Sequence, residues 1–153
     1  MVYTVGEMAK LLGVAPSTLR YYDKEGLLPF VERSSGGQRI FHEEDYEWLR
    51  VIECLKSTGM PLKDIRNYIG MAMRGDETIG ERLALIQKQR ESILAQMQAL
   101  QKTLDLLDYK CWYYETAQDA GTAAVPRDMP EEELPEKLRA VRRRLQVPPK
   151  AES

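Results

Sequence analysis

Apolar and polar residues alternate with helical periodicity along most of this chain, first in short blocks and then in one long repeat. Glycine and proline separate the short blocks, and within each block apolar residues recur at spacings of three and four. This pattern predicts helices over residues 4–12, 16–26, 43–57 and 61–73. The side chains predicted to face inward are Met8, Ala9, Leu11 and Leu12 in the first block, Leu19 in the second, Tyr46, Leu49, Ile52 and Leu55 in the third, and Leu62, Ile65 and Ile69 in the fourth.

From residue 79 onward, apolar residues recur at alternating spacings of four and three over about five heptads. They form a seam along one side of a helix that would be roughly 54 Å long. Because one helix cannot bury such a seam against itself, the repeat predicts a coiled coil with a second copy of the chain. The seam residues are Ile79, Leu83, Ile86, Arg90, Ile93, Met97, Leu100, Leu104, Leu107, Cys111 and Tyr114, of which Arg90 is the charged member.

The C-terminal part of the chain has a different pattern. Residues 121–130 predict a linker, and residues 135–146 predict a short amphipathic helix. The protein is therefore expected to be mainly α, with a head over residues 1–75, a dimerisation helix over 76–116, and a linker and tail helix, partly mobile, over 117–153. The tail helix is expected to place Leu138, Val141 and Leu145 on one side and Arg139, Arg142, Arg143 and Arg144 on the other, with disorder from Pro148 onward.

The first two predicted helices have the features of a helix-turn-helix. Thr4 and Glu7 form the pattern of a capping box at the start of the first helix. Gly13 permits a tight turn, and Pro16 suits the first position of the second helix. The second helix is short and polar and carries Ser, Thr, Arg and Tyr, which donate hydrogen bonds to bases and phosphates, so it is expected to enter the major groove of DNA.

Residues 18–28, TLRYYDKEGLL, and residues 33–41, RSSGGQRIF, together resemble the start of a MerR-family transcriptional regulator. The first segment matches that family's recognition-helix pattern throughout, and the second fits its wing, with a hairpin turn before Arg39. The resemblance extends over residues 2 to about 115. Ala15 and Gln38 depart from the family's frequent Ser and aromatic residue, which bears on affinity or sequence preference more than on fold.

The resemblance implies a winged helix-turn-helix head that binds double-stranded promoter DNA. It also implies that residues 43–73 form a second wing that grips phosphates, with Lys56, Lys63 and Arg66 as the matching cations. The predicted DNA-binding residues are Thr4, Ser17, Thr18, Arg20, Tyr21, Lys24, Arg33, Gly37, Gln38, Arg39, Lys56 and Lys63.

The resemblance further implies an antiparallel homodimer on an inverted-repeat operator, which bends and undertwists a promoter so that RNA polymerase can use it. The predicted dimerisation residues are Ile79, Leu83, Ile86, Ile93, Met97, Leu100, Leu104 and Leu107. Two alternatives belong to other classes: a ligand-sequestering or scaffolding dimer whose head binds DNA weakly or not at all, and an architectural DNA-binding protein without an effector.

Composition agrees with a cytoplasmic, helix-rich protein. The chain has 153 residues, 30% of them charged, and a mean hydropathy of −0.47. We find no apolar run long enough to span a membrane, no secretory signal, and too few cysteines for a disulfide framework. The net charge of −2 does not by itself indicate a partner, because the cations that matter are concentrated in the head. No catalytic set of residues is visible, so we expect neither an enzyme nor a cofactor.

A metal signal is not expected. Metal-sensing relatives place a cysteine at the start of the dimerisation helix and a pair of cysteines after it, whereas this chain has Glu77 and Thr78 at the start and only Cys111 near the far end. Asp119 stands where a second thiolate might fall. A soft-metal site needs at least two thiolates, and the single histidine, His42, is expected to be structural or solvent-facing.

An aromatic cluster near the end of the dimerisation helix is one candidate sensor. It consists of Tyr109, Trp112, Tyr113 and Tyr114, whose ring faces attract cationic or apolar ligands. The alternative is that these rings pack the end of the coiled coil against the partner's head.

Cys54 is the other candidate sensor. Arg50 lies four residues earlier on the same helix face, and a nearby cation stabilises the reactive thiolate. The chain is similar to a subgroup of the family that lacks metal-binding cysteines and responds to aldehydes or related electrophiles, and Cys54 matches that subgroup's cysteine. The alternative is a small buried apolar residue between Val51 and Leu55. Cys111, at a seam position, is expected to serve packing.

Overall fold

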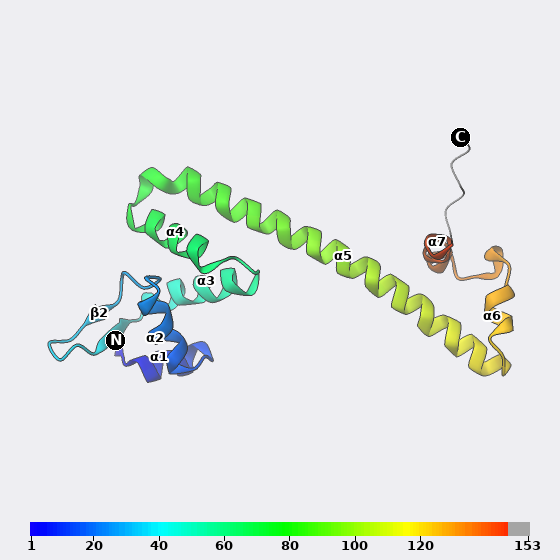
Figure 1. Ribbon diagram of the computed structural model, residues 1–153, viewed down its shortest axis with the longest axis horizontal. Coiled ribbons are helices and arrows are strands. Elements are labelled where there is room, and N and C mark those ends of the chain that lie inside the picture. Colours follow the sequence, from blue (N-terminus) through cyan, green and yellow to red (C-terminus); the bar gives the residue numbers. More distant parts are fainter. Residues whose placement is uncertain (147–153) are drawn as a thin grey trace. The chain divides into compact units, whose positions relative to one another are not determined.

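A computed structural model describes residues 1–146, which form two compact units divided between Ile93 and Leu94, and we describe each unit separately. The first unit is a head of helices α1 (Val5–Leu12), α2 (Pro16–Lys24), α3 (Asp45–Ser57) and α4 (Leu62–Met73) (Figure 1). A small antiparallel sheet in the order β1-β3-β2 completes it, with β1 (Val2–Tyr3), β2 (Glu32–Arg33) and β3 (Arg39–His42). The mainly α fold with a winged helix-turn-helix is confirmed.

The start of α1 is a capping box, as its sequence predicts. The Thr4 backbone N–H donates to Glu7 Oε2 at 2.8 Å, and the Glu7 N–H donates to Thr4 Oγ1 at 3.3 Å. The Thr4 N–H, together with the Thr4 hydroxyl that donates to the same oxygen at 2.9 Å, holds the pKa of the Glu7 carboxyl below its ordinary value. Gly13 ends α1 with a φ of 73°, a left-handed conformation that glycine adopts without strain. The first helix is therefore fixed at both ends by local sequence.

The core of the head contains most of the side chains predicted to face inward, including Met8, Leu19, Ile52 and Ile65. Two predictions were wrong: Leu11 is 54% exposed and Tyr46 is 37% exposed. Both lie at the edge of their helix's apolar face, where they line a shallow surface hollow. The third helix begins at Asp45, later than predicted, because the buried Asp45 carboxylate accepts the His42 backbone N–H at 2.7 Å before the helix starts.

The corner after α4 joins the long helix α5 (Ile79–Ala120) to the head through a short 3-10 helix, η1 (Asp76–Thr78). The buried Thr78 hydroxyl donates to the Met71 carbonyl, and Arg82 donates to the Gly75 carbonyl at 3.0 Å. About two turns further along α5, the Gln89 side chain donates to Thr58 Oγ1 at 2.6 Å. The first turns of α5 are therefore part of the head.

The second unit is built on the remaining part of α5. The helix has 42 residues and extends to Ala120, beyond the predicted end of the repeat. Three short elements follow it: α6 (Ala124–Asp128), η2 (Glu131–Glu133) and α7 (Glu136–Leu145). Their apolar side chains pack on α5 around Tyr109, with Leu134, Leu138 and Val141 all nearly inaccessible. None of the described helices has both the length and the apolar character needed to cross a membrane.

The predicted linker over residues 121–130 was wrong, because this segment contains α6 and the buried Pro126. Its backbone is held by Arg142, which donates to the carbonyls of Met129 and Arg127 at 2.6 Å each. Such a long-range bond between a side chain and the backbone leaves no periodic signal in the sequence.

The tail arginines were predicted to form one polar face, but they have different roles. Arg139 donates to the Leu134 and Glu132 carbonyls at 3.1 and 2.9 Å, and so helps to order the turn before α7. Leu138 and Val141 are buried as predicted, but Leu145 is 47% exposed because it lies in the last turn of α7, beyond the packed region. The disorder predicted from Pro148 onward falls outside the described residues.

Candidate nucleic-acid interface

The recognition helix α2 has two distinct faces. Leu19 and Tyr22 are buried in the core of the head, as is required for the helix to be held rigidly. The opposite face carries polar side chains that are free to meet a ligand. Ser17, Arg20, Tyr21 and Lys24 are exposed and Thr18 is half-buried. The structure therefore brings the predicted DNA-binding residues of this helix onto one accessible side.

The wing is a tight hairpin between β2 and β3. The Ser34 N–H donates to the Gln38 carbonyl at 2.8 Å, and Gly37 closes the turn with a φ of 78°. Ser34 also accepts the Gln38 N–H through its hydroxyl at 3.1 Å, which leaves the Gln38 side chain exposed at the tip. The hairpin predicted over residues 33–41 is confirmed.

The wing and the recognition helix are joined by a carboxylate. Asp23 on α2 accepts hydrogen bonds of 2.7 Å from Arg33 Nη2 and from Arg39 Nε. Arg33 also donates to the Gly37 carbonyl at 3.0 Å, so its guanidinium holds the wing tip and the helix together. Arg33 and Arg39, the two predicted DNA-binding arginines of the wing, thus have intramolecular partners, and Arg39 is only about one-fifth exposed.

A cleft of about 490 Å³ opens between the start of α1, the recognition helix and the wing. Arg20, Gln38 and Arg39 line it, and the exposed end of α1 supplies Thr4, Val5 and Gly6. A helix N-terminus presents unpaired N–H groups and a positive dipole end, which favour phosphate. Residues that lie far apart in the sequence are therefore gathered around one concave, electropositive surface.

A polar network links the recognition helix to α3. The buried Tyr22 hydroxyl donates to the Glu53 carboxylate and accepts a hydrogen bond from Lys56 Nζ at 3.0 Å. Burial, followed by the hydrogen bond to Glu53, raises the pKa of Tyr22 above its ordinary value. Lys56 Nζ, a predicted phosphate contact, also lies 5.1 Å from the Tyr22 ring centroid, and both Lys56 and Lys63 on α4 are exposed. The network holds α2 on α3 in a fixed orientation.

Asp23 and Glu53 are functional candidates that sequence reasoning missed. Asp23 lies within the recognition-helix motif, two residues after Tyr21, and Glu53 directly precedes Cys54. Their partners are many residues away, and a carboxylate in a short helix carries no sign of which cation it will meet. The motif position of Asp23 was the only available signal.

The two candidate sensors occupy different surroundings. Cys54 is exposed on α3, so the alternative of a buried packing residue was wrong, and Arg50 on the same helix is exposed as well. In the aromatic cluster, Tyr109 is buried against the tail of its own chain, and its ring centroid lies 5.9 Å from that of Trp112, while Tyr114 is 62% exposed.

Within residues 1–146 no group of three or more His, Cys, Asp or Glu side chains is placed to hold a metal ion. His42 lies in β3, with Nε2 3.2 Å from the Glu32 carboxylate.

Comparison with known proteins agrees with this geometry. Residues 3–71 match the family model described as MerR HTH family regulatory protein, and residues 46–109 match the model described as MerR, DNA binding. An HTH-type transcriptional regulator of Haemophilus influenzae is 44% identical over 122 residues, which cover 80% of this chain and 90% of that relative.

Solved structures show the same similarity. The crystal structure of HiNmlR, a MerR family regulator lacking the sensor domain and bound to promoter DNA, has 44% identity and a TM-score of 0.71 over 80% of this chain and 98% of that chain. A MerR-family regulator from Bacillus thuringiensis has 43% identity and a TM-score of 0.66 over 72% and 97% of the two chains. With both family models matched and four-fifths of its length aligned to such a regulator, this chain belongs to the MerR family of helix-turn-helix transcriptional regulators, which are not enzymes.

Proposed function

We propose that this regulator is a homodimer that binds an inverted-repeat operator and remodels the promoter in response to a signal. The observation that carries the dimer is the exposure of the seam along α5. Leu83 is 55% exposed, Met97 60% and Leu100 69%. A contiguous apolar stripe of this length is unfavourable in water, and the heptad spacing is the one that a second helix covers.

The tail of the chain leaves this seam accessible. Tyr109 and Trp112, which face the tail, lie on one side of α5, whereas Leu104, Leu107 and Cys111 lie on the seam. At about 100° of rotation per residue, the centres of the two groups are roughly 140° apart around the helix. A partner helix can therefore pair with the seam while the tail stays packed on the opposite side.

The head supports operator binding. Arg20 and Lys24 are exposed on the recognition helix, and Arg20 lines a cleft together with the wing and the start of α1. A relative with 44% identity was crystallised on promoter DNA, which makes the same kind of ligand the natural expectation for this head. In a dimer each head reads one half-site, so the operator is an inverted repeat. Bending and undertwisting of the DNA between the half-sites then realigns promoter elements for RNA polymerase.

Cys54 is the residue that we propose as the sensor of electrophiles. It is exposed, and the residue before it, Glu53, holds the buried Tyr22 of the recognition helix. Alkylation of the Cys54 thiol adds bulk beside the hydrogen bond between Tyr22 and Glu53. A small shift of Glu53 then changes the orientation of α2 relative to α3. The chemical signal thereby reaches the DNA-reading surface through two adjacent residues.

The experiment that tests operator binding starts by selecting binding sites from a randomised duplex library. Affinity for the selected site and for random DNA is then measured over a salt series. We expect a selected inverted repeat, a steep salt dependence, and preference for it by about a thousandfold or more. Salt-dependent binding without sequence preference would instead indicate an architectural protein, and absence of binding would indicate a scaffolding dimer.

A further inference from the structure

The long helix α5 is attached to the head at two places, and the first is the corner where it begins. The chain reverses direction there (Figure 1), with Gly75 at a φ of 86°. The buried Thr78 hydroxyl reaches the carbonyl oxygens of Met71 and Gly75. Arg82 closes the corner by donating from Nε to Thr78 Oγ1 at 3.1 Å and from Nη2 to the Gly75 carbonyl at 3.0 Å. These hydrogen bonds fix the position of the start of α5.

The second attachment is a polar contact about three turns beyond Thr78. Gln89 Nε2 donates to Thr58 Oγ1 at 2.6 Å, and the Thr58 carbonyl oxygen lies 3.4 Å from the same nitrogen. Thr58 is the C-cap of α3, and both its N–H and its hydroxyl donate to the Leu55 carbonyl, at 3.2 and 2.6 Å. The oxygen that Gln89 meets is therefore itself held in a fixed direction.

The directional bond at Gln89 limits how α5 can turn relative to the head. Between the two attachments, Leu85 packs partly buried against the core of the head, and apolar contacts of this kind are non-directional. A helix held only at its first turn can swing about that turn, whereas a hydrogen bond roughly 16 Å further along holds its direction. Gln89 lies about one turn before Ile93, where the first compact unit ends. The bond therefore acts close to the point at which α5 leaves the head.

We propose that the hydrogen bond between Gln89 and Thr58 sets the direction of α5 relative to the head, and thereby the spacing of half-sites that the dimer accepts. This inference rests on the proposed homodimer on an inverted repeat. The seam continues along the same helix, so the direction of α5 decides where the partner's head meets the DNA. An operator with another spacing fits only when α5 turns and this bond breaks in each protomer. Gln89 and Thr58 are thus positioning residues, which act on the spacing through α5 without reading a base.

The test measures the affinity of the full-length protein for duplexes that carry the selected half-sites at the selected spacing and at spacings one base pair shorter and longer. Gln89→Met removes the donor and keeps a long, unbranched side chain, whereas Thr58→Val removes the acceptor and keeps the shape of the side chain. In each variant we expect the preference for the selected spacing to fall about threefold to tenfold, because turning α5 no longer breaks the bond. Affinity for a single half-site should stay close to that of the wild type, since the DNA-reading surface is unchanged.

Two controls and a double variant separate positioning from other effects. Gln98→Met makes the same substitution at an exposed position on the side of α5 opposite the seam, and it should leave the spacing preference unchanged. Thr58→Ser retains the hydroxyl and should retain the preference. The double variant of Thr58→Val and Gln89→Met should lose no more of the preference than either single variant, because both changes remove the same bond. A role in stability alone would instead lower the affinity for the half-site and for every spacing alike.

Three results would overturn the inference. An unchanged spacing preference in Thr58→Val and Gln89→Met overturns it and leaves the inverted-repeat operator intact. Additive losses in the double variant mean that the two residues act separately, through DNA or through the seam. Absence of any spacing preference in the wild type overturns the proposed inverted-repeat operator as well, so that the failure of the inference and the failure of the proposed function give different results.

Discussion

Asp23 on the recognition helix accepts a hydrogen bond of 2.7 Å from Nε of Arg39 on the wing. The two residues are 16 positions apart and belong to the two elements that are expected to contact DNA together. Arg33 reaches the same Asp23 oxygen, so one carboxylate fixes two cations of the wing relative to α2. The Asp23 and Arg39 side chains are each only about one-fifth exposed, and we expect their ion pair to fix the geometry of the DNA-reading surface.

Removing the ion pairs of Asp23 should reduce the specificity for the operator more than the affinity for DNA of any sequence. Asp23→Asn keeps the shape of the side chain but loses its charge, so the wing is less firmly oriented. We expect operator affinity to fall by about 1 kcal/mol, while affinity for random DNA stays constant or rises slightly because a negative charge is lost. Fluorescence anisotropy measures the affinity for the operator duplex and for the random duplex, and the ratio of the two affinities gives the specificity. Glu25→Gln, which removes a nearby charge that lies 3.9 Å from Arg66, is the control, and an equal effect of both variants would contradict the positioning role of Asp23.

Arg20 is expected to read a base. It is exposed on α2 and lines the cleft between that helix, the wing and the start of α1. Arg20→Ala should cost about 1–3 kcal/mol of operator affinity and relax the preference at one base pair, because a bidentate contact is lost. Binding to a panel of single-base operator variants detects this. Lys88→Ala, an exposed cation on α5, is the control. A uniform loss across all sequences would reassign Arg20 to a phosphate.

The seam of α5 should be the dimer interface. Replacing both Leu100 and Leu104 by Asp places charges where the partner helix is expected to bury apolar side chains, and the dimer should dissociate into monomers at micromolar concentration. Sedimentation velocity measures the change. Asp at both Gln98 and Lys102, exposed positions on the opposite side of α5, provides the matched control. A dimer that survives the Leu100/Leu104 change would place the interface elsewhere.

Cys54 should be required for the response to electrophiles but not for DNA binding. Cys54→Ser removes the nucleophile and keeps a small side chain at an exposed position. Operator affinity should stay within about twofold of the wild type, whereas activation of transcription by an added aldehyde should be lost. Cys111→Ser, a change at the other exposed cysteine, is the control, and this variant should retain the response in in vitro transcription. Retention of the response by Cys54→Ser would exclude this thiol as the sensor and favour the aromatic cluster of Tyr109, Trp112, Tyr113 and Tyr114.

The Tyr22 hydroxyl should make stability sensitive to alkaline pH. The folded state raises the pKa of Tyr22 through burial and through Glu53, so ionisation opposes folding. This contribution is complete below the ordinary tyrosine pKa of about 10 and is lost progressively as the pH rises above it. Tyr22→Phe should lower the free energy of unfolding by about 1 kcal/mol at pH 7 and flatten its decline above pH 10. Urea titrations at several pH values measure both effects, and parallel curves for the two proteins would exclude Tyr22 as the titrating group.

Local sequence signals predicted much of the fold, because each acts over a few residues. Thr4 and Glu7 marked the start of α1, Gly13 its end, and Gly37 the hairpin turn, and all three features are present. The spacing of apolar residues at three and four positions correctly identified most of the core. They failed for Leu11 and Tyr46 because periodicity shows which side of a helix is apolar, but not how far the packed region extends.

The candidate interface was predictable only in part. The exposed polar side of α2 follows from the 3.6-residue repeat once Leu19 faces inward. The partners of Arg33, Arg39 and Lys56 do not follow from it, since they depend on contacts across 10, 16 and 34 positions of the chain. The same reason explains why a linker was predicted where Arg142 orders the backbone of the tail.

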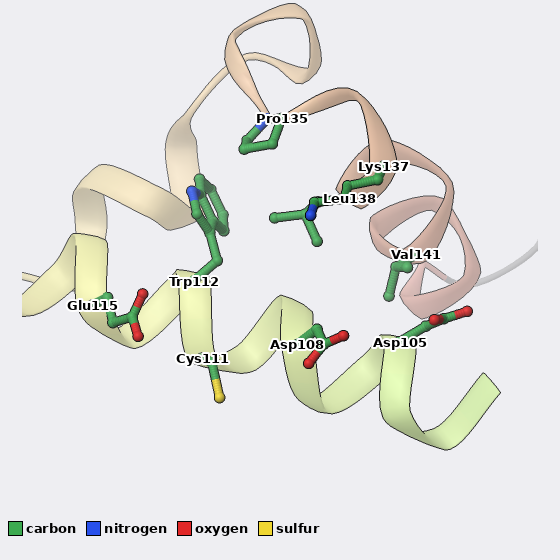
Figure 2. A pocket seen from close by; sticks show the side chains of 9 residues that line it. All are labelled: Asp105, Asp108, Cys111, Trp112, Glu115, Pro135, Lys137, Leu138 and Val141. Carbon is green, nitrogen blue, oxygen red and sulfur yellow. The ribbon is translucent and has the colours of Figure 1, made fainter. Parts of the chain in front are cut away.

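The sequence by itself determined the helix-turn-helix, the wing, the long heptad helix and the family, because these depend on local spacing and on residue types within short motifs. Only the tertiary structure decided that Asp23 joins the wing to α2, that Tyr22 and Glu53 join α2 to α3, and that the tail folds back on α5 around Tyr109. These are contacts between distant residues, whose energy appears only after the chain has brought them together. The cleft that Trp112 of α5 forms with Leu138 and Val141 of α7 (Figure 2) also depends on the tertiary structure, since no sequence pattern pairs these two helices.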